Sequence, residues 1–455
     1  MRMQWDRLLC DDLLGADKQP EKDPSRDVFH QDADRILFSA PFRRLANKTQ
    51  VHPLYEVDHI HHRLIHSAET ASVGRSLGMK LGAGLLEREI EGVGADAPHR
   101  LSYVLQAACL AHDIGNPPFG HSGEESIGKW FCRVLDAGHG LFSQMSCEEQ
   151  VELRRFEGNA QGFRILTRTE MYRNEGGMRL SLATLGAFSK YTCSEPAARA
   201  WKAGGNAPYV SFKKPGFYLS EADYFGAVAQ GVGMIEVAGG AAPMWRRHPL
   251  AFLVEAADDI CYNIVDIEDG FASGDVSYEE AVKLLGPLAG NKTVKDSQSK
   301  EEQVSYLRAI AIGRAIDSCM AAFWDNYDAI MVGRYNGALS EDGPLGPLFN
   351  AIRAFCVERV FTSARKTKLE ILGERAIGNV LDAFSELYVG LERCDWDLDR
   401  LQAEDDSARK LIRASGIDMR DARDPYSAAR SLCDFVSGMT DRYALQMSDL
   451  VLGIR

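Results

Sequence analysis

The chain has 455 residues, of which 45% are hydrophobic and 26% charged, and its formal net charge is −13. This length can bury a large core, and the acidic balance excludes a generally basic nucleic-acid-binding surface, so any anion site must rely on local cations. Ten widely spaced cysteines without a CxxC pair, no signal-peptide core and no apolar run of about 18 residues indicate a reduced, soluble, cytoplasmic protein with no membrane span.

Helical periodicity dominates the chain. Residues 1–25 are polar and charge-rich and are predicted to be an N-terminal tail, and residues 26–455 are predicted to form a single helical domain. Glycine and proline interrupt the periodicity at 200–216 and 238–249. Apolar residues recur at helical spacing in 61–86, 101–112, 127–135, 180–188, 250–267, 304–323, 346–361, 376–391 and 428–452. We therefore predict an all-α fold, with at most a small strand near 209–217.

The stretch at 111–124, AHDIGNPPFGHSGE, carries the strongest chemical signal. His112 and Asp113 are adjacent and can face one metal ion, and a Gly-Asn-Pro-Pro turn then presents His121 and Glu124. A lone His-Asp pair occurs by chance, so a metal site needs partners elsewhere in the chain.

Two other helices offer such partners. Arg63 and His66 are three residues apart and share one helical face. Asp258, Tyr262 and Asp266 recur every four residues in an otherwise apolar helix, which keeps them within an arc of about 80°. Such a stripe is either a solvated face, an internal hydrogen-bond ladder, or a row of functional groups, because a buried carboxylate needs a cation or a donor.

Six ordered segments resemble the deoxyguanosine triphosphate triphosphohydrolase family of the HD-domain phosphohydrolases. The resemblance implies an HD core at about 60–270 and additional C-terminal helices at about 271–455. Its segments are 42–51, 63–70, 111–124, 156–162, 248–270 and 438–444, the last reading GMTDRYA.

The resemblance implies a four-residue metal site. Two imidazoles and two carboxylates suit Mn²⁺, Mg²⁺, Co²⁺ or Fe²⁺ and leave positions for water and phosphate oxygen. Asp259 is the rival of Asp258, which is preferred because Tyr262 and Asp266 then follow at four-residue intervals. The implied metal ligands are His66, His112, Asp113 and Asp258.

The family's reaction cleaves a deoxynucleoside triphosphate between the α-phosphorus and the 5′ oxygen, and releases inorganic triphosphate. By resemblance, His121 protonates the leaving 5′ oxygen while Glu124 orients and charges its imidazole; the alternative is that His121 is only a helix N-terminal residue. Substrate contacts are implied for Gln50 with the nucleoside, Arg63 with the triphosphate, Tyr262 with the sugar and Asp266 with the 3′ hydroxyl. Lys214, beside Lys213, is a further candidate phosphate clamp, although such a pair in a Gly/Pro-rich loop is usually solvated.

Two other functions share these residues. Another HD phosphohydrolase, such as a 5′-nucleotidase or a phosphodiesterase, would use the same metal ligands without the nucleoside contacts. A nucleotide-responsive binding protein would keep the metal site with little turnover, against which an intact His121 and Glu124 argue. The resemblance further implies a homo-oligomer, hexamers among the family's assemblies, and nucleotide or single-stranded DNA as effectors. It leaves the base preference open.

Overall fold

The computed structural model describes residues 1–16, 26–48, 62–138, 140–238, 242–295, 297–359 and 364–454. Within these ranges the chain is helical and has no strands beyond two isolated bridges, so the predicted all-α fold is confirmed. The region predicted as a small strand forms a single short turn, η4 (Val210–Phe212), between stretches interrupted by proline and glycine. None of the described helices is both long and apolar enough to cross a bilayer.

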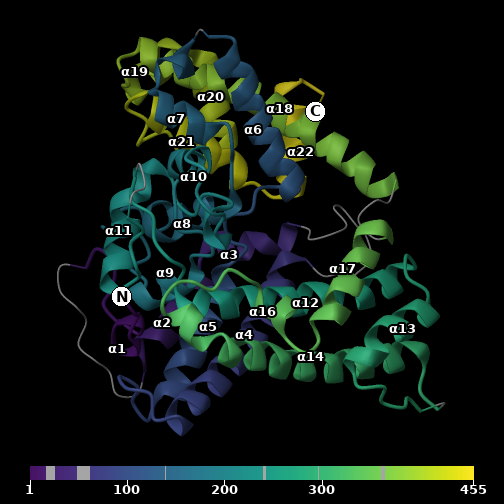
Figure 1. The fold of residues 1–455 in the computed structure, drawn as a ribbon. Coiled ribbons are helices and arrows are strands. Elements are labelled where there is room, and N and C mark those ends of the chain that lie inside the picture. The colour runs from purple at the N-terminus through teal and green to yellow at the C-terminus, as the bar shows by residue number, and fades with distance from the viewer. Residues whose placement is uncertain are drawn as a thin grey trace.

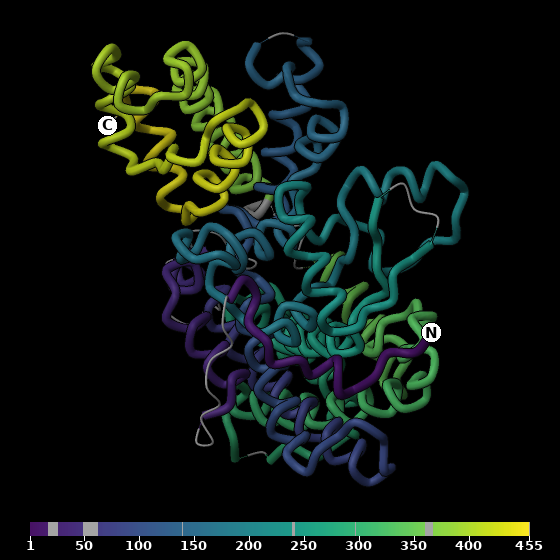
Figure 2. The backbone as a smooth tube through the Cα atoms, turned by 90° about the vertical axis from the view of Figure 1, so that its left-hand side faces the viewer, coloured from purple at the N-terminus to yellow at the C-terminus, as the bar shows by residue number. Residues whose placement is uncertain are grey.

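The described residues form two separate hydrophobic cores, which we call the large lobe and the small lobe. Figure 1 shows the small lobe above the large one, and Figure 2 shows the same division from the side. The small lobe joins helices far apart in sequence: α6 (His121–Asp136), η2 (Leu141–Gln144), α7 (Cys147–Leu153), α18 (Ala364–Arg393), α19 (Leu398–Glu404), α20 (Asp406–Ser415), α21 (Pro425–Ser437) and α22 (Asp441–Val451).

The large lobe contains or adjoins the remaining helices. In chain order they are α1 (Trp5–Leu8), α2 (Val28–Leu37), α3 (Ala40–Arg44), η1 (Leu45–Asn47), α4 (Arg63–Glu87), α5 (Ala97–Ala111), α8 (Gly158–Arg164), η3 (Ile165–Thr169), α9 (Leu182–Phe188), α10 (Glu195–Ala203), η4, η5 (Leu219–Glu221), α11 (Ala222–Gly231), α12 (Pro249–Ser273), α13 (Tyr278–Leu288), α14 (Lys300–Asp325), α15 (Tyr327–Met331), α16 (Leu339–Asp342) and α17 (Gly346–Arg359).

The first sixteen residues differ from the tail predicted for 1–25. Met3, Trp5 and Leu8 are buried in the large-lobe core, and the Trp5 indole donates to the Tyr327 hydroxyl at 2.8 Å. The apolar side chains of this segment are interspersed with charged and polar ones without a helix-length period, so the sequence pattern does not indicate its packing role.

A row of glycines brings α4 and α5 together. A Cβ at Gly78 would lie 2.6 Å from the Leu101 carbonyl oxygen, and one at Gly82 would lie 2.4 Å from the Pro98 Cα. Small residues spaced by four therefore let the two helix backbones approach closely. Because the helices run in opposite directions, the start of α4 lies beside the end of α5, where the conspicuous polar residues of the sequence are found.

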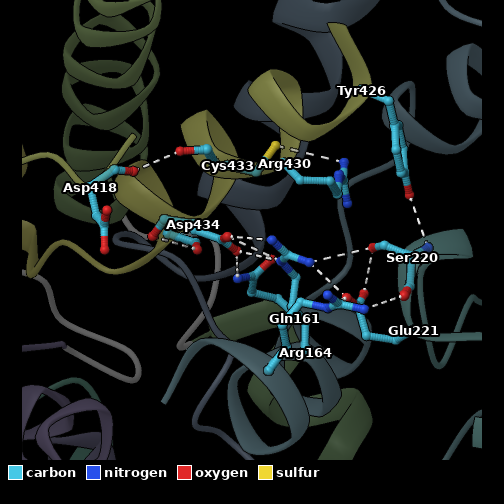
Figure 3. A network of polar contacts seen from close by, with 12 residues as sticks. Gln161, Arg164, Ser220, Glu221, Asp418, Tyr426, Arg430, Cys433 and Asp434 are labelled. Atoms are coloured by element: carbon cyan, nitrogen blue, oxygen red, sulfur yellow. Dashed lines mark hydrogen bonds and ion pairs between the residues drawn. The ribbon is translucent and has the colours of Figure 1, made fainter. Parts of the chain in front are cut away.

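A network of buried charges joins the two lobes (Figure 3). Arg164 of α8 binds both oxygens of Asp434 in α21, at 2.8 and 2.9 Å, and Glu221 at 2.6 Å. Gln161, one turn earlier in α8, also donates to Asp434 at 2.7 Å. Removing one member would leave buried charges unpaired, so this network resists sliding of α21 over α8.

Candidate active site

Three segments of the large lobe place four titratable side chains around one point. The first turn of α4 contributes His66, the end of α5 contributes His112 and Asp113, and the middle of α12 contributes Asp258. The candidate ligand atoms of His66, His112 and Asp258 lie within 4.8 Å of one another. The fourth side chain is adjacent, because an Asp113 oxygen lies 3.6 Å from His112 Nε2.

The hydrogen bonding of His112 prepares it as a ligand. Its Nδ1 lies 2.7 Å from the Cys109 carbonyl oxygen, which can only accept, so Nδ1 carries the proton and Nε2 presents a lone pair. Among the described residues, buried Nε2 has no hydrogen-bond partner, and it faces oxygens of Asp113 and Asp258, each at 3.6 Å. Facing two carboxylates, Nε2 requires positive charge between them, supplied either by its own proton or by a cation, so these residues fit a divalent metal ion.

The two carboxylates are held in the ionised form that a metal requires. Burial raises the pKa of Asp113, but the Arg63 guanidinium, 2.7 Å away, together with positive charge on His112 and His66, more than offsets this and brings the pKa to about 2. Burial likewise opposes the charge of Asp258, and positive charge on His112 and His66 lowers its pKa well below the usual range, as a cation bound between them would. His66 Nε2 lies 3.0 Å from Asp258 Oδ1.

Asp258 and Asp259 have separate surroundings. Asp258 faces the two histidines, whereas Asp259 accepts a short hydrogen bond from the Ser340 hydroxyl and lies 4.0 Å from the Arg353 guanidinium. Burial, with the neighbouring Glu255 charge, raises the pKa of Asp259 to about 6. The geometry thus selects Asp258 over its neighbour as the candidate ligand.

His121 and Glu124 form a pair at the start of α6. His121 Nδ1 lies 2.6 Å from one Glu124 oxygen, and the other oxygen accepts from the Gly158 backbone at 2.7 Å. Glu124 is buried, while the His121 side chain is 84% exposed. The hydrogen bond to Glu124 raises the pKa of His121, and this favours the protonated imidazole that a general acid needs.

Comparison with known proteins places the chain in a family. Residues 63–152 match the model of the HD domain, and residues 346–449 match that of the phosphohydrolase-associated domain. The deoxyguanosinetriphosphate triphosphohydrolase-like protein of Pseudomonas aeruginosa is 38% identical over 467 residues, covering 99% of both chains. The chain belongs to the deoxyguanosinetriphosphate triphosphohydrolase-like family of HD hydrolases. It is therefore a hydrolase.

More distant relatives match along nearly the same extent. The like-named protein of a Synechocystis species is 36% identical, covering 99% of this chain and all of its own length. The deoxyguanosinetriphosphate triphosphohydrolase of Yersinia pestis is 30% identical over 92% of each chain. Both family-model matches fall on the site, because the HD match contains His66, His112 and Asp113 and the associated match contains residues that contact the loop after Asp113.

Two lysines of this family member flank the site. Lys214 pairs with Glu157 at 2.8 Å, and its positive charge acts to lower the pKa of both Glu124 and His121. Lys190, which lies in none of the predicted site motifs, pairs with Glu255 at 3.3 Å, and its positive charge acts on Asp258 and Asp259. A single lysine after a helix carries no motif, so only the fold reveals Lys190.

The predicted sugar contacts lie farther along α12. Asp266 is 3% exposed, and its charge acts on His66 as well as on Tyr262. Burial, with the charge of Asp266, raises the pKa of Tyr262, which therefore stays protonated. Gln50, the predicted nucleoside contact, lies outside the described residues.

Proposed function

We propose that this hydrolase converts deoxynucleoside triphosphates, with dGTP as the first candidate, to deoxynucleoside and inorganic triphosphate in a reaction that requires a divalent cation. The observation that carries the proposal is the buried, partnerless Nε2 of His112 between two ionised carboxylates. The names of the relatives, which refer to deoxyguanosine triphosphate, support the substrate class.

Four residues would hold the cation: His66, His112, Asp113 and Asp258. A bound Mn²⁺, Mg²⁺, Co²⁺ or Fe²⁺ would neutralise phosphate charge and acidify a water for attack on the α-phosphorus. Arg63 fixes Asp113 through one guanidinium nitrogen, and its planar fork is suited to phosphate oxygens. Lys190, near Asp258, and Lys214, near His121, add positive charge around the site, which an acidic protein needs locally to hold a triphosphate.

The acid step belongs to His121. The bond between the α-phosphorus and the 5′ oxygen breaks as water adds, and the basic 5′ oxygen takes the proton of the imidazolium to become the nucleoside hydroxyl. Glu124 stabilises the imidazolium beforehand through the 2.6 Å contact. The high exposure of His121 lets its ring reach a substrate bound above the metal ligands.

Selection of the nucleoside is proposed for three residues. Tyr262 would pack on the sugar and exclude a 2′ hydroxyl, Asp266 would accept from the 3′ hydroxyl, and Gln50 would contact the nucleoside. A site that requires a hydrogen bond and excludes an extra group discriminates strongly between deoxyribose and ribose.

A substrate panel tests the proposal. The four dNTPs and GTP are incubated with Mg²⁺, Mn²⁺ or Co²⁺, and nucleoside, triphosphate, pyrophosphate and orthophosphate are resolved by chromatography. The proposal predicts equal release of deoxynucleoside and triphosphate. Orthophosphate as the only phosphate product would indicate a nucleotidase, and tight nucleotide binding without any product would indicate a binding protein.

We also propose that the chain acts as a homo-oligomer, a hexamer being the first candidate, with nucleotides or single-stranded DNA as effectors. Light scattering with and without dGTP and metal tests the assembly. A monomer under every condition would refute it. Activity measurements with added second nucleotides or an oligonucleotide test the effectors.

A further inference from the structure

The loop between the metal ligands and the acid pair is held by a residue of the small lobe. The backbone N–H of Phe119 donates to Asp441 Oδ1 at 2.9 Å, and both residues are buried. Phe119 has φ +62°, a left-handed conformation that is costly for a bulky residue and persists only where surrounding contacts hold it. It lies six residues after Asp113 and two before His121, so its position sets how the two halves of the site meet.

Two further contacts tie the same loop to the small lobe. The Phe119 ring packs against α18, where a Cβ at Gly373 would lie 2.6 Å from it. The buried Lys48 ammonium donates to the carbonyl oxygens of Asn116 at 2.6 Å and Ser437 at 2.7 Å. The loop is thus anchored at two separate points to residues of α18 and of the α21–α22 junction.

Asp441 also belongs to the charge arrangement beneath the loop. Its carboxylate favours the charged forms of both Lys48 and Arg63. The Arg63 side chain also lies against the loop, since a Cβ at Gly120 would be 2.7 Å from Arg63 Nη2. All the small-lobe contacts, Gly373, Ser437 and Asp441, fall within the phosphohydrolase-associated match at 346–449. This gives that C-terminal region a physical connection to the HD site.

We propose that Asp441 is a positioning residue that, by accepting the hydrogen bond of the Phe119 N–H, fixes His121 relative to the metal ligands. The proposal rests on the proposed function, because it assigns His121 the acid role. Asp441 does not reach the substrate itself; it acts through the backbone of Phe119.

Two substitutions separate acceptance of the hydrogen bond from mere occupancy of the site. Asp441→Asn keeps a side-chain oxygen that can accept from Phe119, whereas Asp441→Leu has similar size and no acceptor. Asp449→Leu, two turns later in α22, is the matched control because the structure gives its carboxylate no contact with the loop.

The hydrogen-exchange rate of the Phe119 amide measures its hydrogen bond directly and needs no substrate. Pro117 and Pro118 have no amide hydrogen, so two fragments with a common start, one ending at Phe119 and the other at Asn116, Pro117 or Pro118, differ by the Phe119 amide alone. We expect that amide to exchange about tenfold faster in the Leu variant and within about threefold of wild type in the Asn variant. Unchanged exchange in the Leu variant, or equal acceleration in both, would overturn the proposal.

Turnover of the full-length protein tests the consequence. Triphosphate release from dGTP should fall about 10- to 100-fold in kcat for the Leu variant, with KM changed by less than about threefold, because a misplaced acid affects chemistry more than binding. The Asn variant should retain at least about a third of wild-type kcat, and the Asp449 control should match wild type. If the Leu variant does not fold, the Asn variant alone decides, since loss of its activity would contradict the proposal. A wild type without triphosphate release would refute the proposed function, while exchange would still decide the role of Asp441.

Discussion

Substitution of Glu124 by Gln tests the acid pair at its most specific point. The Glu124 carboxylate lies 2.6 Å from His121 Nδ1 and raises the pKa of that histidine, while Lys214 and Arg63 oppose the shift. Glutamine can still accept from the Gly158 backbone, so the start of α8 keeps its contact. The variant therefore removes the negative charge and little else.

The expected loss of turnover in the Gln variant follows from the strength of the hydrogen bond between Glu124 and His121. A charge-assisted bond contributes about 1.5–3 kcal/mol, and because the His121 ring is 84% exposed, solvent screening reduces this to about 1 kcal/mol, or about fivefold in turnover. The sign is fixed by the chemistry: without the carboxylate the pKa of His121 falls, so its protonated form is lost at a lower pH. The alkaline limb of kcat should therefore move to lower pH.

The assay is kcat for triphosphate release between pH 5 and pH 9. At the acidic end His121 is protonated in both proteins and their kcat values should differ least. Above neutral pH the kcat of the variant should be lower than that of wild type. Glu125→Gln is the matched control, because Glu125 is exposed and contacts only Lys129 at 3.6 Å within the described residues. An alkaline limb that stays in place or moves to higher pH would show that His121 is not the titrating acid.

Three other predictions concern the metal, the loop and the core. Asp258→Asn should lose bound metal and turnover together, measured by elemental analysis and product release, whereas Asp259→Asn should retain metal, because its carboxylate points to other partners. Gly120→Ala should cost about 1–2 kcal/mol in urea unfolding through its φ of +58°, and should lower kcat as the new Cβ displaces Arg63. Burial raises the pKa of Asp32 from 3.8 to about 6, so the carboxylate destabilises the fold as pH rises through that range. Asp32→Asn should gain stability relative to wild type between pH 4 and pH 7, by at most about 3 kcal/mol, and a constant difference across that range would contradict it.

The all-α fold was predictable because helical periodicity is a local property. The division into two lobes was not, because it depends on contacts such as that of the Trp130 indole with Asp382, which lie 252 residues apart. The packing of the N-terminal segment was not predicted, since Trp5, Leu8 and Leu9 form only a short apolar group among charged and polar residues. Their burial is decided by the surface of the large lobe that they meet.

The residues of the candidate site were likewise only partly predictable from the sequence. The four-residue spacing within α12 predicted Asp258 over Asp259, and the fold turns the two carboxylates toward different partners. Lys190 carried no local pattern that could identify it. Asp441 lay within a segment that resembled the family, yet its hydrogen bond to the Phe119 backbone spans 322 residues and is visible only once the lobes are assembled.

The arrangement of the two cores explains why the proposed chemistry needs both lobes. The candidate metal ligands lie on helices of the large lobe, whereas His121 begins α6, whose Ile127 and Phe131 are buried in the small-lobe core. A rigid shift of one lobe would therefore separate the acid from the metal ligands without breaking either core. The bond from the Gly158 backbone in α8 to Glu124 opposes such a shift at the acid itself. Contacts between the lobes should thus affect kcat more strongly than metal retention, because all four candidate metal ligands belong to the large lobe.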